Sequence, residues 1–144
     1  MHRLYFAILM LLCSVTAFSQ TDDPLIGDWK RTTNHWDSND ERWVPVIEII
    51  RISESDSGRY YISGKVVNAS DGTTRSYMDL GEVRYTNNEL FYSDDWRFQI
   101  HYYKLSFDGN VATRHHLYIL NKVDGDKYTI NRVDGEYYRN NDNW

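Results

Sequence analysis

The chain has little of what usually cross-links a small domain or anchors a protein in a membrane. Its 144 residues include one cysteine and two prolines, so an internal disulfide is excluded. After the first twelve residues, no apolar run approaches the roughly 20 residues that a membrane-spanning helix needs. Lysine and arginine form no cluster, and the formal net charge is −5, which argues against a nucleic-acid backbone as partner. Stability must therefore come from the core.

Motifs for catalysis are also missing. The sequence contains no nucleophile elbow, no paired acid motif and no glycine-rich phosphate loop, which indicates a non-enzymatic protein that needs no cofactor. His101 and His116 would face each other across a hairpin, but zinc takes three or four ligands and a fitting third is not visible. The sequence therefore predicts no metal site.

Residues 1–19 have the features of a cleaved signal peptide. A positive end precedes an almost wholly apolar stretch over residues 4–12, and Ala17-Phe18-Ser19 fits a small-x-small cleavage site. We expect the mature chain to begin at Gln20. Residues 20–144 then form one domain that is secreted or periplasmic.

Cys13 raises the alternative of a lipid-modified N-terminus. Leu11 and Leu12 precede it, where a lipoprotein signal has small residues. The cleavage site after Ser19 explains the same segment better. We therefore expect no lipid anchor, and cleavage would also remove the only cysteine.

Short β-patterned segments divided by two-residue turns fill the rest of the chain. The sequence has 5 tryptophans and 12 tyrosines, residue types that suit strands. No segment beyond the signal has helical periodicity. The predicted strands are residues 27–33, 42–53, 59–68, 74–86, 89–93, 96–107, 111–121 and 127–133, with a short ninth candidate at 136–139. This pattern predicts an all-β fold, a single eight-stranded antiparallel up-and-down β-barrel.

Two Asp-Gly turns set which side chains would face the lumen of that barrel. A two-residue loop at Asp108-Gly109 would place Ile100 opposite Leu117, and one at Asp124-Gly125 would place Leu117 opposite Arg132. The apolar face of these strands is expected to point inward. The residues predicted to line the lumen and bind a ligand are Trp29, Phe98, Ile100, Tyr102, His115, Leu117, Ile130 and Arg132.

A Gly-x-Trp at the head of the first strand and an inward arginine late in the last strand resemble the calycin superfamily, the lipocalins and their bacterial lipocalin-like relatives. The matching residues are Gly27, Trp29 and Arg132. The resemblance implies a lipocalin-like barrel in which the tryptophan closes one end and the arginine stacks on it. Avidins share a similar opening Gly-x-Trp, and the other lipocalin loop motifs are missing.

Two functions are compatible with this sequence. The first is an exported barrel that binds a small apolar or amphipathic ligand in its lumen, which requires an open lumen. The second is an adhesion, inhibitor or glycan-contact module with a filled core, which would use exposed aromatic residues such as Trp36 and Trp43 on the 34–43 segment to contact a protein or glycan. The volume of the lumen distinguishes them.

Overall fold

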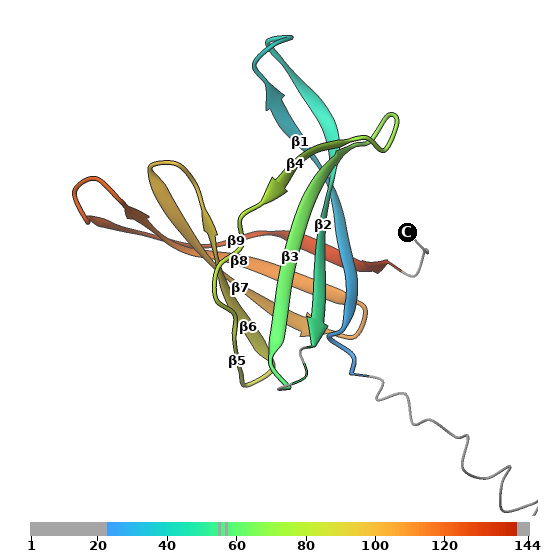
Figure 1. Cartoon of the computed structure of the whole chain (residues 1–144), viewed down its shortest axis with the longest axis vertical. Helices are drawn as coiled ribbons and strands as arrows, with labels where there is room; N and C mark the ends of the chain where they lie inside the picture. Colours follow the sequence, from blue (N-terminus) through green and yellow to red (C-terminus); the bar gives the residue numbers. More distant parts are fainter. Residues whose placement is uncertain (1–22, 55, 57, 141–144) are drawn as a thin grey trace, which may run out of the picture.

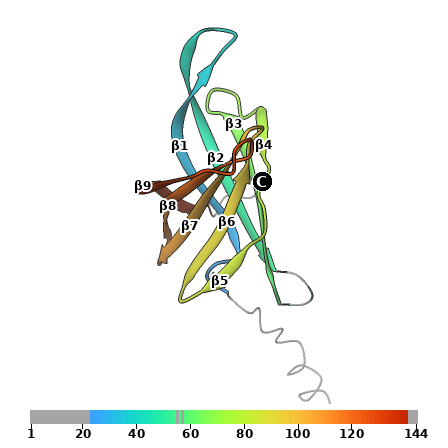
Figure 2. The ribbon, with the colours of Figure 1, turned by 90° about the vertical axis from the view of Figure 1, so that its left-hand side faces the viewer.

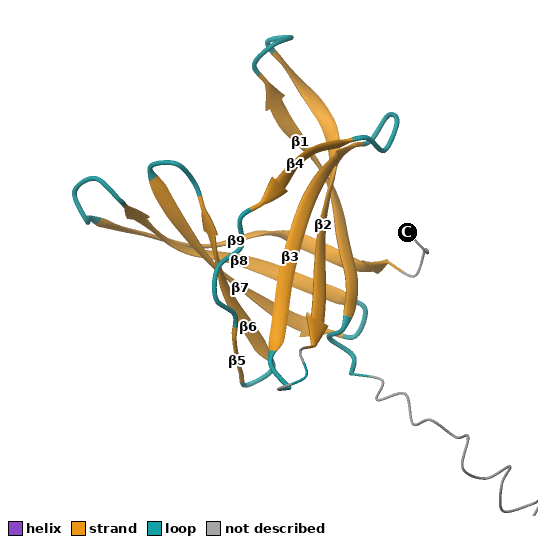
Figure 3. Cartoon of the chain, viewed as in Figure 1, coloured by secondary structure: helices purple, strands orange, loops and turns teal. Residues whose placement is uncertain are grey.

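The structure is a computed structural model that describes residues 23–140 except 55 and 57. The predicted signal peptide, its cleavage site and Cys13 lie outside the described residues. The described part forms nine strands and contains no helix (Figure 3), so it has no helix that could cross a membrane. The strands are β1 (Gly27–Asp37), β2 (Arg42–Glu54), β3 (Tyr60–Asn68), β4 (Thr74–Met78), β5 (Arg84–Thr86), β6 (Glu89–Asp95), β7 (Gln99–Asp108), β8 (Val111–Asn121) and β9 (Lys127–Asn140).

All nine strands belong to one antiparallel sheet. Its order is β4-β3-β2-β1-β9-β8-β7-β6-β5, so consecutive strands pair as hairpins except β4 and β5, which form the two edges of the sheet, and the first strand pairs with the last. The prediction of an all-β antiparallel fold is confirmed. The predicted 74–86 strand is divided into β4 and β5, and the segments predicted at 127–133 and 136–139 are one strand, β9.

The sheet bends sharply but does not close into a barrel, so the eight-stranded barrel is not confirmed. Figure 1 shows β7, β8 and β9 crossing β1, β2 and β3 at a steep angle, and the two views together show the two arms of the sheet folded toward each other (Figures 1 and 2). The segment after β4 bridges the arms, because Leu80 pairs with Asp94 of β6 and the Gly81 N–H donates to the Ser93 carbonyl at 2.7 Å. The concave side between the arms is the interior.

A dense apolar core fills the part of this concave side near the start of β1. Trp29 is fully buried and meets the Phe107 ring edge-on, with 5.2 Å between ring centroids. The Trp29 indole N–H donates to the Leu25 carbonyl at 3.1 Å. The buried core residues are Leu25, Trp29, Ile50, Ile52, Ile62, Leu90, Tyr92, Tyr103, Leu105, Ala112 and Tyr137. We call this region the apolar half.

The strand registers differ from the predicted ones in β7, β8 and β9. A two-residue turn at Asn87-Asn88 is expected from the sequence to place Tyr85 opposite Leu90, and the β5–β6 turn has this register. The β7–β8 loop, however, lies one residue later than predicted, because Asp108 pairs with Val111. Bulges in β7–β8 and β8–β9 shift the pairs further. As a result Ile100 pairs with Leu120, and Arg132 pairs with His116.

The inward face of β7 and β8 is also the opposite of the predicted one. The buried residues of these strands are His101, Tyr103, Leu105, Ala112, Arg114 and His116. The prediction placed the more apolar face inward, because a buried polar group without a hydrogen-bond partner is costly. Here the buried polar groups bind and stack on one another, so the polar face is the buried one.

Candidate functional site

A cleft of about 530 Å³ occupies the concave side beyond the apolar half. Residues from eight of the nine strands line it, so it depends on the bend of the whole sheet. Its lining residues are His35, Glu48, Val66, Ser76, Tyr77, Met78, Asp79, Asp94, Asp95, Trp96, His101, Tyr103, Arg114, His116, Arg132 and Asp134. We call this region the polar half, and its lining of charged, imidazole and aromatic groups makes it the candidate site.

Glu48 is the centre of a buried hydrogen-bond network at this cleft. It is 5 % exposed and accepts hydrogen bonds from Arg31 Nε at 2.6 Å and the Tyr137 hydroxyl at 2.7 Å, while His35 Nε2 lies 2.8 Å from its other oxygen. Burial by itself would raise the pKa of Glu48, but the hydrogen bond from Arg31 and the charges of Arg114 and Arg31 outweigh it and lower the pKa to about 2. Glu48 is therefore ionised at neutral pH.

Arg114 completes the network from the other arm of the sheet. Its Nε donates to Asp134 Oδ2 at 2.6 Å, and its guanidinium lies over the rings of Tyr103 and Tyr137, 4.7 and 5.3 Å from their centroids. Arg31 lies over the same Tyr137 ring at 5.1 Å. Two buried arginines are thus balanced by the carboxylates of Glu48 and Asp134, as a low-dielectric interior requires.

Gly135 makes room for this arrangement. A Cβ at this position of β9 would collide with the Arg31 guanidinium. Without it, Arg31 Nη1 reaches the main chain and donates to the Asp134 carbonyl at 2.9 Å. The glycine therefore serves close approach between a side chain and the backbone of a neighbouring strand.

A column of stacked rings forms one wall of the cleft. Trp96 stacks on His101 with centroids 4.7 Å apart, His101 on His116 at 5.0 Å, His116 on Tyr103 at 4.7 Å, and Tyr103 on Tyr92 at 5.5 Å. Trp96 at the outer end is 55 % exposed. The column runs from the surface to the apolar half and leaves the indole accessible to a ligand.

The two histidines in the column are joined by a hydrogen bond. His101 Nδ1 lies 3.1 Å from His116 Nε2, and His101 Nε2 lies 3.2 Å from Gln99 Oε1. Burial lowers the pKa of both histidines, and the neighbouring His101 lowers that of His116 further. Both rings are therefore neutral at neutral pH, and among the described residues no group of three His, Cys, Asp or Glu side chains could hold a metal ion.

Two further carboxylates, Asp79 and Asp94, line the cleft near Trp96. Asp94 pairs with His101 in the β6–β7 ladder, and Asp79 lies beside it, because the Asp95 N–H donates to the Asp79 carbonyl at 2.9 Å. Within the described part of the chain, neither carboxylate forms an ion pair. Burial raises the pKa of Asp94 and the charge of Asp79 adds to the rise, against a hydrogen bond from the Trp96 indole.

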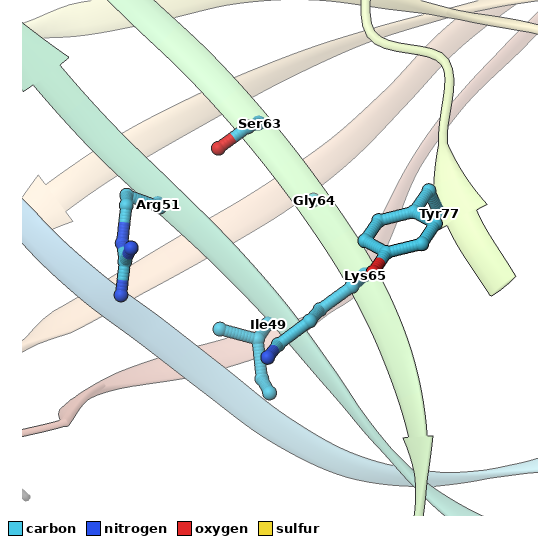
Figure 4. A pocket seen from close by; sticks show the side chains of 6 residues that line it. All are labelled: Ile49, Arg51, Ser63, Gly64, Lys65 and Tyr77. Atoms are coloured by element: carbon cyan, nitrogen blue, oxygen red, sulfur yellow. The ribbon is translucent and has the colours of Figure 1, made fainter. Parts of the chain in front are cut away.

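A second hollow lies on the convex side of β2, β3 and β4. It measures about 260 Å³ and is lined by Ile49, Arg51, Ser63, Gly64, Lys65 and Tyr77 (Figure 4). Lys65 extends beside the Tyr77 ring toward Ile49 in Figure 4, and Ile49 is 3 % exposed. The hollow is a shallow groove over one covered isoleucine, with fewer convergent polar groups than the cleft.

The β1–β2 hairpin extends beyond the rest of the sheet (Figures 1 and 2). Segment 34–41 was predicted as a loop, but β1 and β2 remain paired as far as Asp37 and Arg42. Near the tip, Trp36 and Trp43 meet edge-on with centroids 5.7 Å apart. They are 52 % and 65 % exposed.

The structure does not bring the predicted lumen residues together. Trp29 lies in the apolar half, and Arg132 is exposed at the rim of the cleft. Phe98 is 58 % exposed. The remaining five, which are partly buried, line neither the cleft nor the core: Ile100, Tyr102, His115, Leu117 and Ile130. Their role in ligand binding stays a prediction.

The arginine over Trp29 is Arg139 rather than Arg132. Its guanidinium lies 5.0 Å from the centroid of the indole, and the two residues are partners in the β1–β9 ladder. The expected type of contact is therefore present with a different residue. The bulges in β9 and its length, 14 residues, place Arg139 rather than Arg132 beside the first strand.

The residues of the ion network could not be predicted from a sequence motif. Arg31, Glu48, Arg114 and Asp134 are ordinary strand residues with no motif, and they come together only when β1, β2, β8 and β9 pair. One signal was available. Glu48 lies on the same face of β2 as the buried residues Val46, Ile50 and Ile52. A single carboxylate on such an apolar face requires a buried cation.

Comparisons with known proteins give no relative for this chain. No protein-family model matches it, and neither a curated protein nor a solved structure matches it. The resemblance to calycins therefore rests on the sequence features alone.

Proposed function

We propose that this protein is an exported, non-enzymatic binding protein that holds a small amphipathic ligand in the cleft of the polar half. The observation that carries the proposal is the cleft of about 530 Å³ itself, which lies above a filled apolar core and combines ring faces with convergent polar groups. Binding sites for small molecules commonly have this size and this mixture.

The character of the cleft supports an amphipathic rather than an apolar ligand. A fatty acid or similar chain would need an apolar lumen, but Trp29, Leu90 and Leu105 leave no room at the apolar end. The cleft offers flat ring surfaces at Trp96 and hydrogen-bonding groups at Asp94 and the histidines. A ligand with a ring and a polar group matches both.

The lipocalin-like assignment and export are part of the same proposal. Support comes from Gly27 and Trp29 at the head of β1, the arginine over the Trp29 ring, and the signal-like sequence of residues 1–19. N-terminal sequencing of the exported protein tests the last point. A chain that begins at Gln20 is expected, and one that begins at a lipid-modified Cys13 would contradict it.

A fragment screen by NMR tests cleft binding. Compounds that bind are expected to shift the Trp96 indole N–H resonance, and the variant Ser76→Trp, which fills the cleft from β4, should abolish these shifts. Ser53→Trp is the matched control, because Ser53 is also an exposed strand serine but does not line the cleft. If no compound binds in a way that Ser76→Trp blocks and Ser53→Trp preserves, the proposal fails.

A second function is favoured by the exposed tryptophan pair at the tip of the β1–β2 hairpin. Exposed aromatic rings on a projecting hairpin are suited to contact a glycan or another protein. The test is binding to a glycan array before and after the double change Trp36→Ala and Trp43→Ala. Tyr128→Ala, which removes another exposed ring, should leave such binding intact.

A further inference from the structure

Two carboxylates that line the cleft have no cationic partner among the described residues. Asp79 and Asp94 lie side by side and neither forms an ion pair within residues 23–140 as far as these are described. The arginine deepest in the cleft, Arg114, is already bound to Asp134. A ligand that enters between these groups therefore meets two carboxylates that form no ion pair within the described residues, although Asp94 accepts a hydrogen bond from the Trp96 indole.

His116 adds a third acceptor. Each neutral imidazole carries one N–H, and because Gln99 Oε1 accepts from His101 Nε2, the His101 Nδ1 lone pair accepts from His116 Nε2. His116 Nδ1 is then left with a lone pair, and no described residue donates to it. His116 is only 6 % exposed and lines the cleft, so a ligand in the cleft can donate to this lone pair.

Building on the proposed cleft binding, we infer that the ligand is a small organic ammonium ion, whose N–H groups donate to Asp79, Asp94 and the free ring nitrogen of His116. The exposed Trp96 face beside Asp94 provides a cation–π surface and a platform for the ring of the ligand. The three acceptors belong to different segments that line one cleft of about 530 Å³. A cation of several heavy atoms fits this space. The ammonium supplies N–H donors to the three acceptors and a positive charge to the two carboxylates.

Three probes of similar shape separate charge from shape: phenethylamine, 2-phenylethanol and 3-phenylpropionate, titrated into the ¹⁵N-labelled protein at pH 7.5. Phenethylamine is expected to shift the Trp96 indole N–H and to bind at least about tenfold more tightly than the neutral alcohol, a difference of about 1.4 kcal/mol. The anionic probe is expected to bind more weakly still. Equal or tighter binding of the alcohol or of 3-phenylpropionate, for example at Arg132 on the rim, would overturn the inference.

Variants locate the recognition. Asp94→Asn keeps an oxygen that can accept from the Trp96 indole, so it should preserve the fold while weakening phenethylamine binding at least about tenfold. Asp79→Asn and His116→Phe should each weaken it several-fold. Asp126→Asn removes the same charge from an exposed turn outside the cleft and should change nothing. Binding that is insensitive to Asp94→Asn and Asp79→Asn would refute the inference even if His116→Phe does not fold.

The ligand class and the binding site can fail separately. If the alcohol or 3-phenylpropionate binds and Ser76→Trp blocks it, the ammonium inference is wrong while cleft binding stands. If none of the three probes binds, the ammonium inference is also wrong, and the wider fragment screen decides whether the cleft binds ligands at all.

Discussion

The two halves of the concave side are built by the same strands but are stabilised by different interactions. On β1, Trp29 belongs to the apolar half, and Arg31, the next residue on that face, belongs to the polar half. On β7, Leu105 and His101 are divided in the same way. The apolar half is stabilised by close packing, and the polar half by the ion pairs around Glu48 and Asp134 and by stacked rings.

This difference determines how each half responds to change. Removal of atoms from the apolar half leaves a cavity, whose cost depends on volume. Removal of one charge from the polar half leaves the opposite charge buried and unpaired. The resulting loss of stability is electrostatic and therefore depends on pH. A cleft next to buried charges is also more useful for recognition, because its polar groups are held in place before a ligand arrives.

The largest effect is expected from Glu48→Gln. This change leaves Arg31 and Arg114 buried with one carboxylate between them, so the free energy of unfolding should fall by about 3 to 5 kcal/mol. Chemical denaturation measures it. The double change Arg31→Met with Glu48→Gln restores the charge balance and should cost at least about 1 kcal/mol less than the sum of the single changes. Simple additivity would mean that the network does not act as a unit.

In the apolar half, Leu105→Ala should lower the free energy of unfolding by about 3 kcal/mol, because Leu105 is fully buried and its removal leaves a cavity. Leu117→Ala makes the same chemical change at the bulge of β8, where the side chain is only partly buried. It should cost no more than about 1 kcal/mol. The reverse order of the two losses would show that the inward face was assigned wrongly here.

The pH dependence of stability should come from the polar half. The pKa of His101 and His116 lies below the ordinary value of 6.5, so the unfolded state binds more protons and stability present above about pH 6.5 is lost as the pH falls. Glu48 affects stability at lower pH, because its pKa of about 2 lies below the ordinary value of 4.5. Its contribution is lost between about pH 4.5 and 2. Urea denaturation between pH 7.5 and 3.5 should show a continuous decline.

Neighbouring charges modify this decline. Asp94 and Asp134 favour protonation of the histidines, while Arg114 and Arg132 oppose it. Asp94 itself works in the opposite direction, because its raised pKa means that its protonation on acidification favours the folded state. Asp94→Asn should therefore steepen the loss of stability on acidification. A profile that is flat from pH 7.5 to 5 would contradict the assignment of neutral, buried histidines.

The smallest effect is expected where the apolar half meets solvent, at the contact between Trp29 and Arg139. A double-mutant cycle with Trp29→Phe and Arg139→Gln should give a coupling of about 0.5 to 1 kcal/mol. The same cycle with Arg132→Gln should be additive within about 0.3 kcal/mol. Coupling to Arg132 instead of Arg139 would restore the pairing that the sequence predicted.

The sequence by itself determined where most of the strands lie, and it determined the register of one turn. Alternating patterns and turn residues are local, so the segment 111–121 was predicted with the bounds that the structure has, and Asn87-Asn88 with φ of 50° and 61° forms the expected turn. The resemblance to calycins implied that Arg132 stacks on Trp29, and the structure has Arg139 over this ring instead.

Only the tertiary structure decided which face of β7 and β8 is buried and which arginine lies over Trp29. Each bulge adds one residue to one strand and so changes every residue pair beyond it. No local sequence pattern predicts where such a bulge occurs. The candidate site depends on the same information. Glu48, Arg114 and Asp134 lie on three strands far apart in the sequence, and their burial is favourable only because the bend of the sheet brings opposite charges together.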